Sequence, residues 1–236
     1  MARLNDVAPD GAVTRVTYGA LNLAMRVSRE HPEALTPGER YKVRLKLDDI
    51  GYRVPKGHRL RLSFSSAYFP LLWPPKEKAR LTLFTEDASL WVPVHDGPLL
   101  TAAPFPPPES ARPIRLTELR AAESTWQVEE DAASGRVTTI FAVDSGKHRF
   151  EDHGLVVGDS SREEYSVAPN DPSSAAADLT WSYEAAREDV EVRVESHCRL
   201  TGNEERVLIE AEQTAFENGA EVHHRTWRRK IPRRWV

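Results

Sequence analysis

Cysteine is almost missing from this 236-residue sequence: Cys198 stands alone, so no internal disulfide can form. A single free thiol is compatible with a reducing compartment, and we expect a cytoplasmic protein. No apolar run approaches the roughly 18 residues of a membrane span. Residues 1–6 also lack the apolar region of a signal peptide. The sequence therefore predicts neither export nor membrane anchoring.

The sequence also lacks the Gly-x-Ser-x-Gly elbow that exposes the nucleophile of a serine hydrolase. The nearest stretch is residues 158–162, which read Gly-Asp-Ser-Ser-Arg and have no second glycine. We interpret them as an ordinary polar turn between strands. We expect no catalytic residue and no enzyme activity from this chain alone, so an independent enzyme is the last of the functions considered.

The eight histidines show no metal-ligand spacing. His223 and His224 are adjacent and would point to opposite faces of a strand, so they cannot chelate together. His148 and His153 are five apart and are interpreted as solvent-facing or turn-capping side chains. Cys198 falls on the apolar side of its segment, where a free cysteine behaves as a small hydrophobe. We expect no metal and no cofactor.

The net charge of −4 gives no general attraction to nucleic acid or anionic lipid. Residues 1–97 hold 15 Lys+Arg against 11 Asp+Glu (15 − 11 = +4), and residues 98–236 hold 17 against 25 (17 − 25 = −8). Two modules of different character are indicated. The basic run at residues 228–234 is interpreted as a solvated edge strand protected by its charge, with no nucleic-acid partner.

Apolar and polar residues alternate with a period of two, which is typical of half-buried β-strands. The pattern is clearest at residues 190–200 and recurs at residues 41–47, 59–64, 137–143 and 178–183. Glycine-containing turns are predicted at residues 9–11, 36–38, 144–146 and 217–219. Strands and turns at this spacing indicate antiparallel sheets in a sandwich or jelly roll.

Six prolines between residues 98 and 113 would prevent strand pairing there and favour an extended polyproline segment. The predicted organisation is therefore a first β-module at residues 1–97, a proline-rich linker at residues 98–113, and a second, β-rich module at residues 114–236.

Aromatic and apolar residues are dense directly after the alternating segment at residues 59–64. Five of these residues form a candidate contact surface for another domain: Tyr68, Phe69, Leu71, Leu72 and Trp73. Large exposed apolar patches usually mark interfaces. The alternative is a loop that folds back onto the core of its own module, and the sequence favours neither.

The first module resembles the C-terminal non-catalytic domain of the X-prolyl dipeptidyl peptidase and cocaine esterase (CocE/NonD) family of hydrolases. The phrases that carry the resemblance occur in the same order, at residues 2–7, 9–11, 19–23, 37–41, 55–62, 65–66 and 69–70. Residues 114–236 are similar, less closely, to the β-rich extension of some longer acyl hydrolases.

The resemblance implies an all-β fold: a galactose-binding-like jelly-roll β-sandwich that packs against an upstream α/β-hydrolase domain, followed by a second antiparallel module. The catalytic triad of that family lies in the hydrolase domain, so no catalytic residue is carried over. Family members have further strands before the phrase at residues 2–4, and we expect the sandwich to be N-terminally incomplete, as in a fragment.

Such a chain is expected to be a non-catalytic accessory region of an acyl esterase or X-Pro dipeptidyl-peptidase. Its partner would be an α/β-hydrolase domain, a second copy of the chain, or the chain's own second module folded back over the gap, because missing strands leave unpaired backbone groups. The alternative function is a carbohydrate-binding module, in which Trp73, Trp91 and Trp126 would stack on sugars; core positions for these tryptophans are equally compatible with the sequence.

Overall fold

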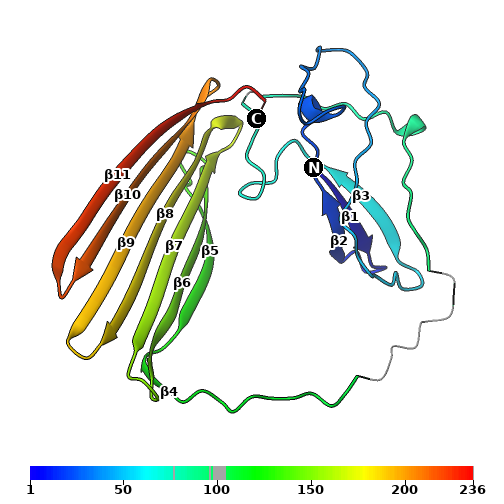
Figure 1. Ribbon diagram of the computed structural model, residues 1–236. Coiled ribbons are helices and arrows are strands. Elements are labelled where there is room, and N and C mark those ends of the chain that lie inside the picture. Colours follow the sequence, from blue (N-terminus) through cyan, green and yellow to red (C-terminus); the bar gives the residue numbers. More distant parts are fainter. Residues whose placement is uncertain (77, 96, 98–104, 236) are drawn as a thin grey trace.

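The computed structural model describes residues 1–76, 78–95, 97 and 105–235. Within these residues almost all regular structure is antiparallel β-sheet; the helical elements are the single turns η1 (Leu23–Met25) and η2 (Thr85–Asp87). Figure 1 shows two separate sheets, one from each half of the chain. The prediction of an all-β fold is confirmed. None of the described helices is long and apolar enough to cross a membrane.

The first sheet has the strand order β2-β1-β3. Its strands are β1 (Ala2–Val7), β2 (Val13–Gly19) and β3 (Arg59–Phe64), and β1 pairs antiparallel with both neighbours. The predicted turn at residues 9–11 joins β1 to β2. The predicted strand at residues 59–64 is confirmed. Its apolar side chains Leu60, Leu62 and Phe64 are exposed, however, so they do not face a core as the alternation indicates.

The strand predicted at residues 41–47 is wrong, because no residue of that segment is in a strand. The segment meets β2 only at its end, where the Asp48 amide donates to the Tyr18 carbonyl over 2.8 Å. A Cβ atom at Gly19 would lie 2.1 Å from the Lys46 carbonyl oxygen, so only glycine allows this close crossing. A chain that crosses the end of a strand cannot form a ladder of hydrogen bonds along it.

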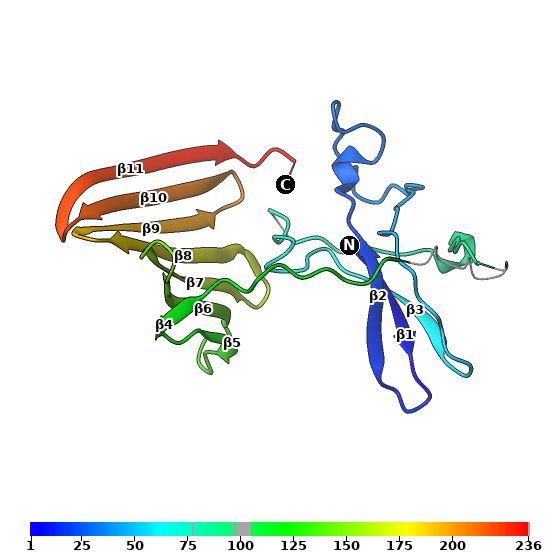
Figure 2. The same cartoon turned by 60° about the horizontal axis from the view of Figure 1, so that its bottom comes forward.

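The second sheet is an eight-stranded antiparallel meander with the order β11-β10-β9-β8-β7-β6-β4, and β5 also pairs with β6. Its strands are β4 (Leu116–Arg120), β5 (Glu123–Glu130), β6 (Val137–Phe150), β7 (Val156–Ala168), β8 (Asp171–Arg187), β9 (Val190–Gly202), β10 (Arg206–Glu217) and β11 (Ala220–Pro232). The long strands lie side by side in Figure 2. The strands predicted at residues 137–143, 178–183 and 190–200 are confirmed.

The turn between β10 and β11 has the chemistry that the sequence indicates. Asn218 and Gly219 both have positive φ angles, of 49° and 80°, which suits a two-residue hairpin turn. Strand β11 then forms one edge of the sheet, as predicted for the basic C-terminal run. Residues 105–113 of the predicted linker are exposed and contain no strand or helix, whereas residues 98–104 lie outside the described residues.

Two predicted turns of the second module are wrong. Residues 144–146 lie inside β6, where the pairing with β7 shifts register between Asp144 and Lys147. Gly146 has a φ of +81°, and the residue sits in a β-bulge. Residues 158–162 lie inside β7, paired with β6 on one side and β8 on the other. Backbone partners on neighbouring strands continue both ladders through stretches whose local sequence favours a turn.

Candidate domain-contact surface

Residues 68–73, called the aromatic segment below, form a tight turn directly after β3. The backbone amide of Tyr68 donates to the Leu72 carbonyl over 3.0 Å, and the Leu72 amide donates back to the Tyr68 carbonyl over 2.8 Å. This pair of bonds holds the ends of the turn together.

Phe69 connects the aromatic segment to the second sheet. Its ring centroid lies 5.5 Å from that of Trp73 and 6.3 Å from that of Tyr165 in β7, both edge-to-face. Tyr165 in turn lies 6.2 Å from Phe141 in β6, and Phe141 lies 5.5 Å from Trp126 in β5. Five rings thus form a continuous series from Trp73 to β5, and every pair except the tilted Phe141–Trp126 pair has the edge-to-face geometry that aromatic rings favour.

Tyr68 faces the first sheet instead. The Arg3 guanidinium lies 5.0 Å from the centre of its ring, and Arg15 donates to the phenolic oxygen over 2.9 Å. Cation–π contacts with arginine contribute about 0.5–1 kcal/mol at exposed sites and more where they are desolvated. Tyr68 therefore attaches the aromatic segment to its own module, while Phe69, on which Trp73 packs, attaches it to the second.

A second contact between the modules is made by Arg233, just after β11. Its guanidinium donates to the Pro74 carbonyl over 2.8 Å and to the Asn203 carbonyl over 3.2 Å. Asn22 of the first module also donates to the Trp235 carbonyl. Arg233 is only 7% exposed, so the prediction of a solvated side chain at this position is wrong. Burial lowers the pKa of its guanidinium, because desolvation disfavours the charged form.

The structure separates the five residues of the candidate contact surface. Phe69 and Trp73 lie together beside the second sheet, Tyr68 packs on arginines of the first, and Leu72 supplies the backbone pair that closes the turn. Leu71 points outward and is exposed. Sequence reasoning did not single out Tyr165 or Arg233 as partners. The alternation at residues 137–143 predicts a strand that contains Phe141 and was the only local indication of this part of the contact. No local pattern distinguishes Arg233 from its basic neighbours.

A buried carboxylate holds the first module together. Asp6 is 3% exposed and accepts a hydrogen bond from the Tyr52 hydroxyl over 2.7 Å. The Nδ1 atom of His58 lies 2.9 Å from the other oxygen of the same carboxylate. The hydrogen bond to Asp6 raises the pKa of Tyr52, since it favours the neutral phenol. The arrangement joins the segment at residues 52–58 to the central strand β1.

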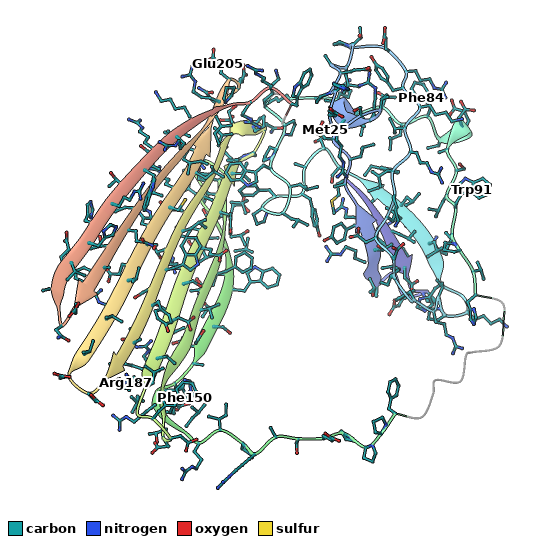
Figure 3. All side chains as sticks on the ribbon, in the orientation of Figure 1. Met25, Phe84, Trp91, Phe150, Arg187 and Glu205 are labelled. Atoms are coloured by element: carbon teal, nitrogen blue, oxygen red, sulfur yellow. The ribbon has the colours of Figure 1, made fainter. Side chains whose placement is uncertain are left out.

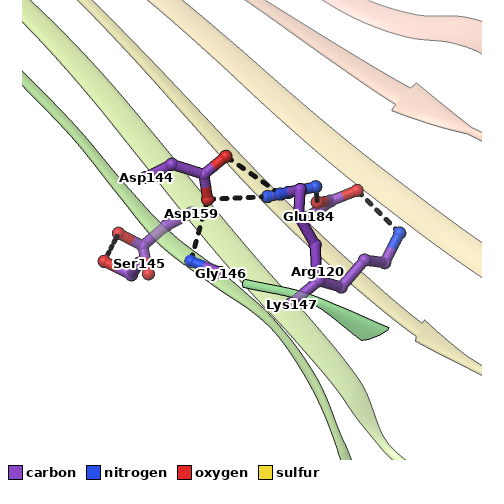
Figure 4. A network of polar contacts seen from close by, with 7 residues as sticks. All are labelled: Arg120, Asp144, Ser145, Gly146, Lys147, Asp159 and Glu184. Atoms are coloured by element: carbon purple, nitrogen blue, oxygen red, sulfur yellow. Dashed lines mark hydrogen bonds and ion pairs between the residues drawn. The ribbon is translucent and has the colours of Figure 1, made fainter. Parts of the chain in front are cut away.

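Charged residues of the second module form a network across β4, β6 and β8 (Figure 4). Arg120 contacts the Asp144 carboxylate over 2.9 Å and Glu184 over 2.7 Å, and Lys147 contacts the other Glu184 oxygen over 2.8 Å. The hydrogen bond from Lys147, with further help from Arg120, lowers the pKa of Glu184. The hydrogen bond from Arg120 lowers the pKa of Asp144. The network lies on the polar side of the sheet and connects strands that are not all neighbours.

Replacing Glu184 with glutamine is expected to lower the free energy of unfolding by about 1 kcal/mol near pH 7, since two charge-assisted contacts to a largely buried carboxylate are lost. A lowered folded-state pKa contributes stability above the unfolded value of roughly 4.3, and this contribution is lost as the pH falls through the folded value. Urea unfolding at several pH values should therefore show the wild type and the variant converging in acid. Glu204→Gln, at an exposed turn, is the matched control, and a constant difference down to acid pH would contradict the assignment.

The described residues contain no group of three or more histidine, cysteine, aspartate or glutamate side chains placed to hold a metal ion. His223 and His224 follow one another in β11, as predicted. Of the tryptophans considered for sugar stacking, Trp73 is half-buried in the aromatic series, whereas Trp91 and Trp126 are 88% and 74% exposed. Figure 3 shows Trp91 projecting from the chain beyond η2. The alternative prediction, that Trp91 and Trp126 occupy core positions, is therefore wrong.

The described residues form antiparallel sheets, a turn that joins two modules, and buried polar groups that hydrogen-bond segments far apart in the sequence. For the first module, comparison with known families agrees with the resemblance seen in the sequence. Residues 1–91 match the family model of the X-Pro dipeptidyl-peptidase C-terminal non-catalytic domain, which confirms the resemblance found in the sequence. No curated protein and no solved structure matches the chain. The second sheet lies outside the matched residues.

Proposed function

We propose that this chain is an accessory region of a serine hydrolase of the acyl-esterase or X-Pro dipeptidyl-peptidase type. It supports an α/β-hydrolase domain that is not part of these 236 residues. The observation that carries the proposal is the match of residues 1–91 to a domain described as non-catalytic. The single free cysteine favours the cytoplasm as the place where it acts.

The geometry of the chain supports a structural role. Two of its buried polar groups, Asp6 and Arg233, are engaged in hydrogen bonds that join segments far apart in the sequence. Ser160 and Ser161, the nearest serines to an elbow-like phrase, lie in the middle of β7. A nucleophile elbow requires a sharp strand-to-helix turn, which a continuous strand does not supply.

The isolated chain is expected to show no turnover of Ala-Pro-p-nitroanilide or p-nitrophenyl acetate, because it offers no elbow and no oxyanion amides. A fluorophosphonate serine probe should leave it unlabelled. Labelling that is lost on Ser160→Ala would show instead that the chain carries its own nucleophile.

The supporting role has a separate test. The DNA immediately upstream is expected to encode an α/β-hydrolase domain with a Gly-x-Ser-x-Gly elbow. Co-expression of that domain with this chain should yield a complex with more hydrolase activity per mole than the domain alone. A hydrolase domain with full activity and stability in the absence of this chain would contradict the role.

A carbohydrate-binding module is the second candidate function, and the exposure of Trp91 and Trp126 is the observation that favours it. Exposed indole rings can stack on sugar faces. A glycan array with the wild-type chain tests it: binding that is lost on Trp91→Ala or Trp126→Ala supports sugar recognition. An array without any bound glycan would contradict sugar recognition and leave the accessory role as the supported function.

A further inference from the structure

Four arginines lie on the same side of the first sheet. Residues that pair across an antiparallel ladder point to the same side, and Asn5 of β1 pairs with Arg15 of β2 and with Arg61 of β3. Arg3 precedes Asn5 by two positions and Arg59 precedes Arg61 by two, so both join this side. No position on this side of the three strands holds an acidic residue. The four residues Arg3, Arg15, Arg59 and Arg61, called the arginine cluster below, therefore bring four positive charges together.

The arginine cluster has no carboxylate partner in the part of the chain that the structure describes. Arg3 and Arg15 both lie against the ring of Tyr68, with guanidinium carbons 5.0 and 5.9 Å from its centre. The polar contact of the Arg15 side chain is its hydrogen bond to the Tyr68 hydroxyl, and neither Arg59 nor Arg61 forms an ion pair with a described residue. Two guanidinium groups on one ring repel each other. An anion bound between them would remove this repulsion.

The same side of the sheet offers hydrogen-bond donors that lack acceptors. Within the described residues, the Nε atom of Arg3 and the Oγ atom of Ser65 are buried and have no hydrogen-bond partner. Ser65 lies diagonally beside Arg3, because its amide continues the ladder of β1 and β3 by donating to the Met1 carbonyl over 3.0 Å. The Tyr68 hydroxyl accepts from Arg15, so its own hydrogen can be donated. Positive charge combined with unpaired donors is typical of a site for an anion.

We propose that the arginine cluster binds a small molecule that carries an oxyanion, either a carboxylate or a phosphate group. Arg3 and Arg15 are the first contacts, because a guanidinium donates two parallel hydrogen bonds to one oxyanion. The hydroxyl groups of Tyr68 and Ser65 supply further donors. Arg61 lies in the next row, about 7 Å further along the strands than Arg3, so a second oxyanion of the same ligand can reach it.

The extent of the cluster and the charge of the chain favour a small ligand over a long polyanion. The cluster occupies three strands of six or seven residues. The whole chain has a net charge of −4, which gives no general attraction to nucleic acid. A molecule with two or three carboxylates, such as citrate, matches the spacing of the rows. This inference does not rest on the proposed hydrolase partner.

Nitrogen-15 NMR on the full chain tests the site, because the Nε–H groups of Arg3 and Arg15 give separate resonances. Citrate added at constant ionic strength should shift both resonances with saturation, at a dissociation constant of about 1 mM or below. Inorganic phosphate should shift the same resonances about tenfold less tightly, because it reaches one row only. Glucose, which has no charge, should shift neither. Resonances that stay in place up to about 20 mM of both anions would overturn the proposal.

Arg15→Gln should weaken citrate binding at least about tenfold, since it removes one of the two guanidinium groups at the Tyr68 ring. Arg15 is exposed, so the fold should remain intact, which circular dichroism verifies. Arg29→Gln, at another exposed arginine of the first module, is the matched control and should bind citrate as the wild type does. Equal weakening by both substitutions would reflect overall charge and contradict the site. Binding of a hexaglutamate peptide without any binding of citrate or phosphate would also overturn the proposal, because the ligand would then be an acidic protein segment.

Discussion

Replacing Arg233 with alanine is expected to lower the free energy of unfolding by about 3 kcal/mol, the largest effect of any single substitution considered for this protein. The guanidinium donates to the carbonyls of Pro74, which is buried, and of Asn203, which is exposed, and both acceptors would lose a charge-assisted hydrogen bond. Burial of the charge itself is costly, as the lowered pKa of Arg233 indicates, and its removal offsets part of the loss. The lost packing of the long side chain adds to the cost.

Urea unfolding followed by circular dichroism measures this effect. Arg234→Ala is the matched control, because the neighbouring arginine is exposed, and it should change stability by less than about 0.5 kcal/mol. Arg233→Lys should fall between the two, since an ammonium keeps the charge but cannot supply the planar fork that reaches two carbonyls. Equal stabilities for the Arg233→Ala and Arg234→Ala variants would show that the contact with Pro74 does not stabilise the fold.

Replacing Phe69 and Trp73 together with serine is expected to separate the two modules. Each ring is half-buried; Phe69 packs edge-to-face on Tyr165 of the second sheet, and Trp73 packs edge-to-face on Phe69. Truncation of a half-buried aromatic side chain costs about 2 kcal/mol. Because the two rings touch each other, the double variant should cost less than the sum of the single ones.

Small-angle scattering gives a direct measurement of the separation. The radius of gyration should increase in the double variant, compared at an oligomeric state verified by light scattering, while circular dichroism shows both sheets retained. Trp91→Ser is the matched control, because this tryptophan is exposed and its loss should leave the radius of gyration unchanged. An unchanged radius in the Phe69 and Trp73 variant would mean that the aromatic series does not position the modules.

Two contacts of different chemistry therefore join the modules: an aromatic one at Phe69 and a polar one at Arg233. In the first module, both contacts are made by residues 69–74. In the second module, one is made by Tyr165 in β7 and the other by Arg233, which follows β11. The contact with Tyr165 is apolar and tolerates small shifts, whereas the buried hydrogen bond to the Pro74 carbonyl depends on direction. Together they fix both the position and the orientation of one module against the other.

Much of the second sheet could be predicted from local sequence. The alternation at residues 190–200 gives β9, because a strand exposes successive side chains on opposite faces. Asn218 and Gly219 give the β10–β11 turn, since these residues adopt positive φ at little cost. The basic run at residues 228–230 gives an edge strand, because charged side chains protect unpaired backbone groups.

The errors occurred where residues distant in sequence decide the backbone conformation. Residues 144–146 have the composition of a turn, yet β7 supplies partners on both sides of them, and the chain forms a bulge instead. Residues 41–47 alternate like a strand, yet the chain only crosses the end of β2 at Gly19, and alternation without a neighbouring strand gives no ladder. Local pattern limits the conformations available, and the presence of a partner selects among them.

The sequence by itself determined that this protein is all-β, that its first module is similar to a known non-catalytic domain, and that most of the second module consists of strands. These properties depend on the spacing of apolar residues and on turn chemistry, both of which are local. Only the tertiary structure decided that Phe69 meets Tyr165 and that Arg233 is buried against Pro74, 159 positions away. The residues near Arg233 in the sequence do not distinguish it from the exposed Arg234. Burial depends on which distant residues pack against a side chain in the folded protein.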